Sequence, residues 1–334
     1  MKRASIWRVP ASALLIAASG IAARGSGAPL PAAAQLDLEP GIVAAEAVRA
    51  TPIILPTTSE VIAAVADAAK VVRYPTQPAT ISIDRQGCDG SFAATTTPVC
   101  VYGDPQGSHT LVVYGDSHGR MWLPAFDAIG KFAHWKVLQL TKGHCQVADY
   151  STWLDSEKRV YGECVAFRSF ALDRIRRLHP DVVVLASMWK DALMAVNGRP
   201  TTKGLAAAWA AGLASMITKI KQSAKKVIVL GDIAYPKQAG ADCLSLHRDD
   251  IRPCNTPRVD AVFEADNSID RTVATRQGAL YVNTIPWFCT ATVCPAVVGG
   301  LATHLDYYHV APDYALWLAD ALATATELLP GGSA

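Results

Sequence analysis

From residue 108 onward the chain alternates between two hydrophobic patterns. Short runs rich in valine, isoleucine and leucine predict strands at 110–114, 135–140, 181–186, 226–230 and 279–283. The segments that follow these runs have apolar residues at helical spacing and predict helices at 122–132, 165–178, 205–223, 259–277 and 312–328. Continuously apolar strands that alternate with helices are typical of a parallel sheet covered on both faces. The pattern therefore predicts a three-layer α/β/α sandwich around a five-stranded parallel sheet.

The start of the chain has a different pattern. Met1–Arg8 carries three basic residues, Val9–Ala23 is predominantly apolar, and small residues follow. A charged start, a short apolar stretch and a small-residue end are typical of a secretory signal. Residues 1–34 are therefore predicted to be a signal peptide or, if they are not cleaved, an N-terminal anchor. Either form predicts a protein that is secreted or otherwise extracytoplasmic.

Prolines break up the region between this leader and the first predicted strand. Residues 35–105 are predicted to be a Pro/Ala-rich lead-in with one short helix, capped near Ser59 and running through Val61–Val72. Residues 106–330 are predicted to form the catalytic domain.

Composition narrows the function classes. The 31 Lys and Arg residues nearly balance the 29 Asp and Glu residues, which leaves a formal charge of +2. No long basic run occurs, so we expect no nucleic-acid partner.

The 8 cysteines include no Cys-x-x-Cys, so the spacing gives no support to a zinc ribbon or a thioredoxin-type site. In an exported protein, an even number of cysteines predicts disulfides, although the sequence permits many connectivities. Because each successive pair lies in a loop-like stretch, we expect neighbours to pair. The expected pairs are Cys88 with Cys100, Cys145 with Cys164, Cys243 with Cys254, and Cys289 with Cys294.

Candidate chemistry lies at the carboxyl ends of the first and last predicted strands, where ligands of parallel sheets bind. Ser117 lies between Gly115 and Gly119 at a strand-to-helix turn. A serine at such a turn is either a helix N-cap or a nucleophile beside a backbone N–H that can stabilise an oxyanion. After the last strand, Asp306 and His309 can supply the carboxylate and the imidazole that activate a serine.

These two motifs resemble the first and fifth blocks of the SGNH hydrolases, which are serine esterases and acyltransferases with a flavodoxin-like sandwich. The chain is most similar to the SGNH domain appended to family-three membrane acyltransferases, which O-acylate envelope and surface glycans. The similarity spans roughly residues 85–328. It rests on Gly115-Asp116-Ser117-His118 and on the segments 182–189, 229–243 and 287–298.

The resemblance implies a role for each matching residue. Ser117 is expected to be the nucleophile, His309 the base and Asp306 its orienting partner. The expected oxyanion donors are the N–H of Ser117, Gly143 and the indole of Trp189. Since the Gly-x-Asn-Asp block of the broader family is missing after the third strand, the second and third donors stay open. His118, Tyr307 and Tyr308 are expected to contact substrate, and no cofactor or metal is expected.

The expected reaction is serine-dependent transfer of an acyl group, acetyl in our interpretation, to an envelope or surface glycan. The expected partners are a glycan acceptor, an acyl-ester donor and a separate membrane acyltransferase. A carbohydrate O-acetylesterase that uses the same triad and an inactive glycan-binding domain are the alternatives.

A metallophosphoesterase is a more distant alternative. Asp116-x-His118 resembles the first block of that family, and His304, Asp306 and His309 could be metal ligands. Its Asn-His-Asp/Glu and Gly-His-x-His blocks are absent from the sequence.

Overall fold

The computed structural model describes residues 55–74 and 87–329. The predicted leader, 1–34, lies outside the described residues, as does part of the lead-in. The central sheet has the order β1-β4-β3-β7-β10-β12, and β2 also pairs with β4. Its strands are β1 (Asp89–Gly90), β2 (Val101–Gly103), β3 (His109–Gly115), β4 (Trp135–Lys142), β7 (Val182–Ala186), β10 (Lys226–Leu230) and β12 (Leu280–Val282).

All five predicted strands are present, and they pair in parallel with one another. In the register of β3, Gly115 lies opposite Thr141 of β4 on one side and Ala186 of β7 on the other. The carboxyl ends of these strands therefore meet at one edge of the sheet, which confirms the predicted fold class and puts the strand-end motifs on the same side of the molecule.

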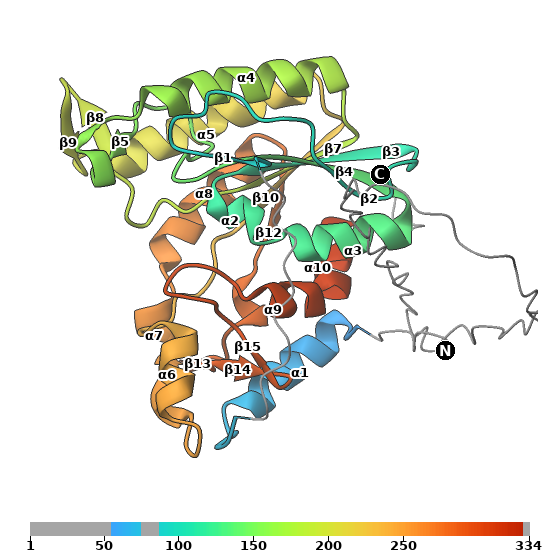
Figure 1. Cartoon of the computed structure of the whole chain (residues 1–334), viewed down its shortest axis with the longest axis vertical. Coiled ribbons are helices and arrows are strands. Elements are labelled where there is room, and N and C mark those ends of the chain that lie inside the picture. Colours follow the sequence, from blue (N-terminus) through green and yellow to red (C-terminus); the bar gives the residue numbers. More distant parts are fainter. Residues whose placement is uncertain (1–54, 75–86, 330–334) are drawn as a thin grey trace, which may run out of the picture.

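Alternate residues of the strands face two separate hydrophobic clusters because side chains along a strand point to opposite faces. Leu111 and Val113 belong to one cluster, and Val112 and Tyr114 belong to the other. In Figure 1, α4 and α5 lie above the sheet while α3 and α10 lie below it. The covering helices are α3 (Leu123–Ala133), α4 (Gly162–Leu178), α5 (Leu205–Lys221), α8 (Glu264–Arg276), α9 (Pro312–Trp317) and α10 (Ala319–Thr326).

The sheet begins earlier in the chain than the predicted boundary at 106. β1 is parallel to β4, and β2 runs antiparallel to the same strand. Helix α1 (Thr58–Ala68) buries Val61 and Val65 in the main cluster. The prediction of a separate lead-in through 105 is therefore wrong for the described part. The sequence did not reveal β1 and β2 because strands of two and three residues are too short to show a hydrophobic period.

Besides shifts of a few residues at other helix ends, three predicted helices differ in their cap or are divided. The cap of α1 is Thr57, not Ser59, because the Thr57 side chain and Glu60 form a reciprocal capping box. The helix predicted at 259–277 is divided into α7 (Arg258–Ala261) and α8. The one predicted at 312–328 is divided into α9 and α10 at Leu318.

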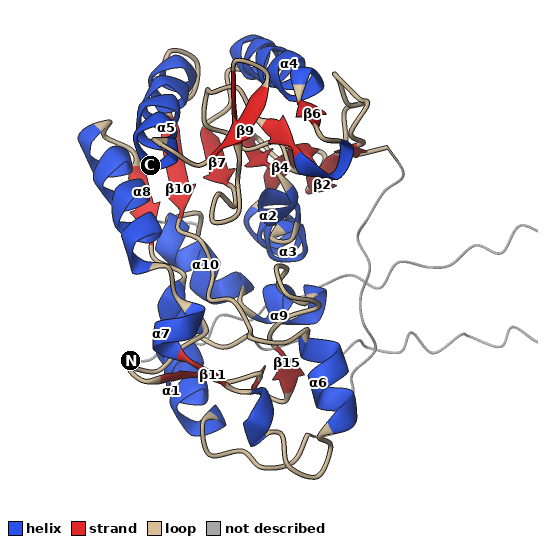
Figure 2. Cartoon of the chain, turned by 90° about the vertical axis from the view of Figure 1, so that its left-hand side faces the viewer, coloured by secondary structure: helices blue, strands red, loops and turns tan. Residues whose placement is uncertain are grey.

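Below the sheet lies a smaller part of the chain, drawn at the bottom of Figure 2. Its elements are α6 (Gly240–Leu246), η2 (Arg252–Cys254), β11 (Thr256–Pro257), η3 (Ile285–Trp287), β13 (Val293–Cys294), β14 (Val297–Val298) and β15 (Leu301–Ala302). Some of its residues form a satellite cluster, namely Cys243, Leu244, Ile251, Cys254, Ala296 and Val297, while η3 and Cys294 pack in the main cluster. Within 55–74 and 87–329, no helix has the length and apolar character needed to cross a membrane.

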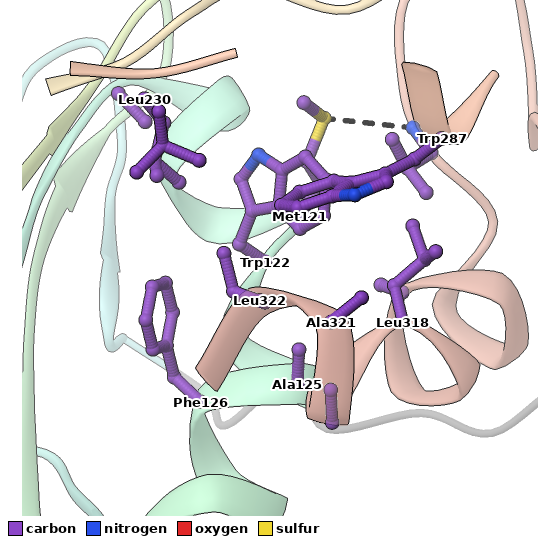
Figure 3. Packing of buried hydrophobic residues seen from close by; sticks show 14 of the residues in the cluster. Met121, Trp122, Ala125, Phe126, Leu230, Trp287, Leu318, Ala321 and Leu322 are labelled. Atoms are coloured by element: carbon purple, nitrogen blue, oxygen red, sulfur yellow. Dashed lines mark hydrogen bonds between the residues drawn. The ribbon is translucent and has the colours of Figure 1, made fainter. Parts of the chain in front are cut away.

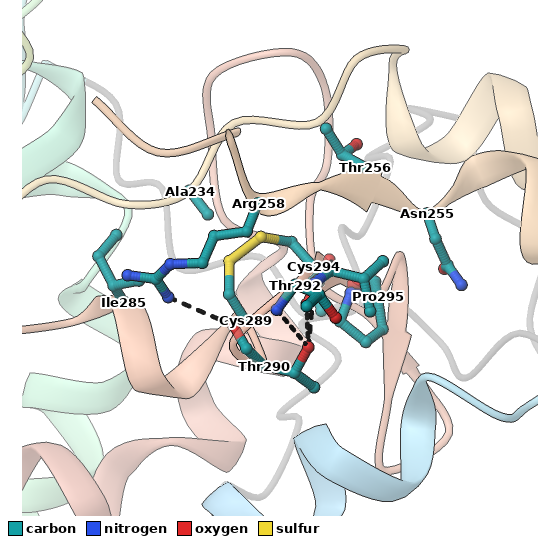
Figure 4. The surroundings of a disulfide bond; sticks show 12 residues. Ala234, Asn255, Thr256, Arg258, Ile285, Cys289, Thr290, Thr292, Cys294 and Pro295 are labelled. Atoms are coloured by element: carbon teal, nitrogen blue, oxygen red, sulfur yellow. Dashed lines mark hydrogen bonds between the residues drawn. A yellow bond between two sulfur atoms is a disulfide. The ribbon is translucent and has the colours of Figure 1, made fainter. Parts of the chain in front are cut away.

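The structure has all four disulfides in the expected neighbour pairing. Figure 4 shows Cys289–Cys294 closing a short loop in which Thr290 accepts hydrogen bonds from the backbone of Thr292 and Val293. Arg258 donates to the carbonyl of Thr290 at 3.4 Å. This bond joins the loop to α7, and the disulfide itself packs in the main cluster.

Candidate active site

The turn after β3 presents Ser117 at the first position of helix α2 (Ser117–Arg120). A side chain at Gly115 would collide with the carbonyl oxygen of Ala186, so this position requires glycine. The buried carboxyl of Asp116 accepts the N–H of His118 at 2.8 Å and that of Met188 at 3.1 Å. Asp116 thus ties the turn that carries Ser117 to the residues just after β7. Burial raises the pKa of Asp116 to about 6, and neighbouring His118 opposes that rise.

The segment that carries Asp306 and His309 is a closed loop. A β-bridge joins His304 to Val310, and the N–H of Leu305 donates to the carbonyl of His309 at 2.8 Å. The N–H of Val310 donates to the sulfur of Met121 at 3.5 Å, drawn as the dashed line in Figure 3. Met121 directly follows α2, so this contact fastens the loop to the turn that bears Ser117.

Within the loop, Asp306 and His309 form a hydrogen-bonded pair. Nδ1 of His309 lies 2.8 Å from Oδ2 of Asp306, and since a carboxylate only accepts, Nδ1 carries the proton and Nε2 can act as a base. The N–H groups of Tyr308 and His309 also donate to Asp306. Burial alone would raise the pKa of Asp306, but these hydrogen bonds lower it to about 2. The carboxylate is therefore ionised and can stabilise an imidazolium.

Ser117 and His309 line one pocket with a volume of about 260 Å³. No hydrogen bond joins them among the described residues, and such bonds commonly tighten only when substrate binds. The other lining residues are Asp116, His144, Gln146, Trp153, Leu154, Asp155, Ser156, Met188, Asp191, Ala192, Leu193 and Tyr308.

The three residues expected to contact substrate lie in different places. Tyr308 lines the pocket, whereas Tyr307 is exposed and does not. His118 is buried at 1% exposure, and its Nδ1 lies 2.8 Å from Asp232, at the end of β10. Burial would lower the pKa of His118, but the charge of Asp232 raises it above the ordinary value. Because His118 is buried, its expected contact with substrate is wrong, whereas that of the exposed Tyr307 stays a prediction.

The two expected oxyanion donors besides Ser117 also lie elsewhere. The N–H of Gly143 donates to the carbonyl of Gly90 at 3.3 Å, so the pairing of β4 with β1 uses it. Trp189 is buried and stacks on Trp209, with ring centroids 5.1 Å apart. The indole of Trp209 donates to Asp270 at 2.6 Å. Neither Gly143 nor Trp189 lines the pocket, and both predictions are corrected.

The sequence reasoning missed Gln146, whose side chain is buried and lines the pocket. Its backbone is held by the neighbouring disulfide Cys145–Cys164 and by Arg168, whose Nε donates to the Gln146 carbonyl at 2.8 Å. The carboxamide nitrogen of Gln146 can donate a hydrogen bond into the pocket. Its place three residues after Gly143, just beyond a strand end, is the signal that could have identified it.

The metal cluster of the distant alternative does not form. Nε2 of His304 lies 2.7 Å from the carbonyl of Ala234 and Nδ1 lies 2.9 Å from the hydroxyl of Thr303, so both ring nitrogens are occupied. Burial lowers the pKa of His304 to about 4. His304 thus holds the loop that carries Asp306 and His309 to the segment after β10, and its occupied ring nitrogens are not available as metal ligands.

Comparisons with known proteins agree with this architecture. The family model described as "SGNH domain (fused to AT3 domains)" matches residues 87–324. The periplasmic domain of a lipopolysaccharide acetyltransferase from Salmonella ser. Paratyphi A is 18% identical, with a TM-score of 0.51 over 66% of this chain and 84% of that one, and shares the fold. An acetylxylan esterase from Geobacillus stearothermophilus is 14% identical, with a TM-score of 0.38 over 67% of this chain and 98% of that one. No curated protein matches the chain in sequence.

Proposed function

Because the chain belongs to the SGNH domain family, we propose that it is an extracytoplasmic serine acyltransferase that transfers a short acyl group, acetyl in the simplest case, to a glycan hydroxyl. The observation that carries the proposal is that Ser117 lines the same pocket as His309, whose other ring nitrogen is hydrogen-bonded to Asp306. The likeness to the lipopolysaccharide acetyltransferase domain and the four disulfides support an envelope substrate and an oxidising compartment.

In the first half-reaction, Oγ of Ser117 attacks the carbonyl carbon of an acyl-ester donor while Nε2 of His309 takes the hydroxyl proton. The bond from the acyl carbon to the donor oxygen then breaks, and His309 returns the proton to that oxygen. An acyl ester on Ser117 and the free donor alcohol result. Asp306 keeps the imidazole oriented and stabilises its charge.

In the second half-reaction, a sugar hydroxyl loses its proton to His309 and attacks the acyl carbon. The ester bond to Ser117 breaks, its oxygen regains the proton from His309, and the glycan carries the acyl group. Each half-reaction passes through a tetrahedral oxyanion. We assign its stabilisation to the N–H of Ser117 and the side-chain amide of Gln146, because both can donate and Gln146 lines the same pocket.

The rival function is hydrolysis, in which water replaces the sugar hydroxyl in the second half-reaction. The two differ only in the acceptor. To distinguish transfer from hydrolysis, the protein is incubated with p-nitrophenyl acetate in the presence and absence of a bacterial envelope oligosaccharide. The products are identified by mass spectrometry.

The proposal expects acetylated oligosaccharide to appear, with Ser117→Ala abolishing it. If acetate and p-nitrophenol form but no acetylated oligosaccharide appears at any oligosaccharide concentration, the protein is an esterase. A folded protein that neither releases nitrophenol nor acetylates sugar is an inactive binder.

A further inference from the structure

One side of the pocket is a wall built from two excursions that leave the sheet after β4 and after β7. The first carries the hairpin of β5 (Trp153–Leu154) and β6 (Arg159–Val160), and the second carries the hairpin of β8 (Met194–Val196) and β9 (Arg199–Thr201). Figure 1 shows β5, β8 and β9 gathered at one end of α4 and α5. We call these two excursions the hairpin wall.

Backbone pairing joins the two halves of the hairpin wall. The N–H of Trp153 donates to the carbonyl of Leu193 at 2.9 Å, the N–H of Ala195 donates to Ser151 at 2.8 Å, and a β-bridge links Thr152 to Met194. Segments far apart in the sequence thus form one surface.

The first excursion is also fixed to the helix behind it. The buried guanidinium of Arg168, on α4, donates to the hydroxyl of Thr152 at 2.8 Å and to the carbonyl of Gln146 at 2.8 Å. Cys145–Cys164 joins the same excursion to α4. Because the backbone is held at these points, the residues it presents to the pocket are preorganised for binding.

The hairpin wall supplies half of the pocket without contributing to the triad. Trp153, Asp155 and Ser156 line it from the first excursion, and Asp191 lines it from the second. Resting on the proposed function, we propose that this wall binds one neutral sugar ring of the glycan whose hydroxyl exchanges the acyl group with Ser117.

The chemistry of the wall matches such a ring. The C–H face of a pyranose packs by dispersion on an aromatic ring, which Trp153 supplies. Hydroxyl groups at the rim of a pyranose donate to carboxylates, which Asp155 and Asp191 supply. Each carboxylate also pairs with a lysine at 2.9 Å, Asp155 with Lys158 and Asp191 with Lys190. Since these charges are balanced within the wall, it favours a neutral ring over an anionic one.

The size of the pocket sets a second limit on the occupant. Its volume of about 260 Å³ lies below the range of about 300–1,000 Å³ typical of drug-sized ligand sites. One sugar ring with a short acyl group suits this space. A long acyl chain would have to lie beside the carboxylates, which disfavours it.

The test compares two esters with the same acetyl group. Methyl 6-O-acetyl-α-D-glucopyranoside carries a sugar ring, and p-nitrophenyl acetate does not. For Trp153→Ala we expect the ratio of kcat/KM on the sugar ester to kcat/KM on p-nitrophenyl acetate to fall about tenfold, mainly through KM. Trp153→Phe should restore most of the ratio, and Asp191→Asn should lower it. Phe170→Ala, which removes an α4 aromatic outside the pocket, is the matched control and should leave the ratio unchanged.

Three results separate the two proposals. An equal loss on both esters in Trp153→Ala, with Trp153→Phe equally impaired, would mean that the wall is only structural and overturn its assignment. Unchanged kcat/KM on both esters in Trp153→Ala also overturns it and leaves the proposed function standing. If the wild-type protein is folded yet cleaves neither ester, the proposed function fails instead.

Discussion

His304 makes the stability of the fold depend on pH in a defined window. It is buried, holds the loop of Asp306 and His309 to Ala234, and has a pKa lowered by burial to about 4. The unfolded chain binds a proton at His304 below its ordinary pKa of about 6.5, whereas the native state does so only near pH 4. The stability contributed by neutral His304 is therefore complete above pH 6.5 and is lost as pH falls through the window toward 4.

The linkage relation converts these two pKa values into free energy. Relative to pH 7.5, His304 should remove about 1.3 kcal/mol of stability at pH 5.5 and about 2.5 kcal/mol at pH 4.5. Asp116 and Asp270 have raised pKa values of about 6 and about 7, so their contributions change in the opposite sense as the solution is acidified. The pH dependence of the wild type alone therefore mixes opposing effects.

A variant with no titratable group at position 304 separates the contribution of His304 from those of the two aspartates. In urea unfolding followed by tryptophan fluorescence with the disulfides intact, His304→Gln should destabilise the protein at pH 7.5 because it disturbs the contacts to Ala234 and Thr303. Its destabilisation relative to wild type should shrink by about 2.5 kcal/mol between pH 7.5 and pH 4.5. If the difference between the two proteins stays constant to within about 0.5 kcal/mol across this range, the reasoning is refuted.

Two further predictions concern the walls of the pocket. Gln146→Ala should lower kcat on p-nitrophenyl acetate by about 100-fold with little change in KM, because an oxyanion donor acts only in the transition state; a rise in KM at constant kcat would contradict that role. Replacing Cys145 and Cys164 by serine should reduce the free energy of unfolding by about 3 kcal/mol, because this disulfide closes a loop of 19 residues. It should also reduce kcat/KM, because the disulfide holds the backbone next to Gln146. The control is the same change at Cys243 and Cys254, which close a loop of 11 residues that does not line the pocket. It should reduce stability similarly but leave kcat/KM unchanged. Equal losses of activity in the two variants would argue against a special role for Cys145–Cys164.

The central strands could be predicted from the sequence because they are buried on both faces and are therefore apolar throughout. Ser117, Asp306 and His309 could be proposed because each lies in a short motif next to a strand end. Hairpins of two or three residues per strand have no such pattern, so Trp153 was missed. Its place in the pocket depends on pairing with the excursion after β7.

The wrong site assignments share a cause, which is dependence on a distant partner. His118 turns inward because its ring meets Asp232, 114 residues later in the chain. Gly143 is unavailable because the two-residue strand β1 uses its N–H, and nothing in the apolar pattern marks that strand. Trp189 packs on Trp209, where the indoles oppose the rise in the pKa of Asp270 that burial causes. Such pairings follow from the tertiary structure and not from local sequence.

The proposed function requires Ser117 to be a nucleophile that His309 activates. The most direct measurement is labelling of the folded protein by a fluorophosphonate probe, with the modified residue identified by peptide mass mapping. We predict one adduct on Ser117, none on Ser117→Ala, and much slower labelling of His309→Ala with its fold retained. A folded wild-type protein that leaves Ser117 unlabelled, or that labels equally fast without His309, would contradict it.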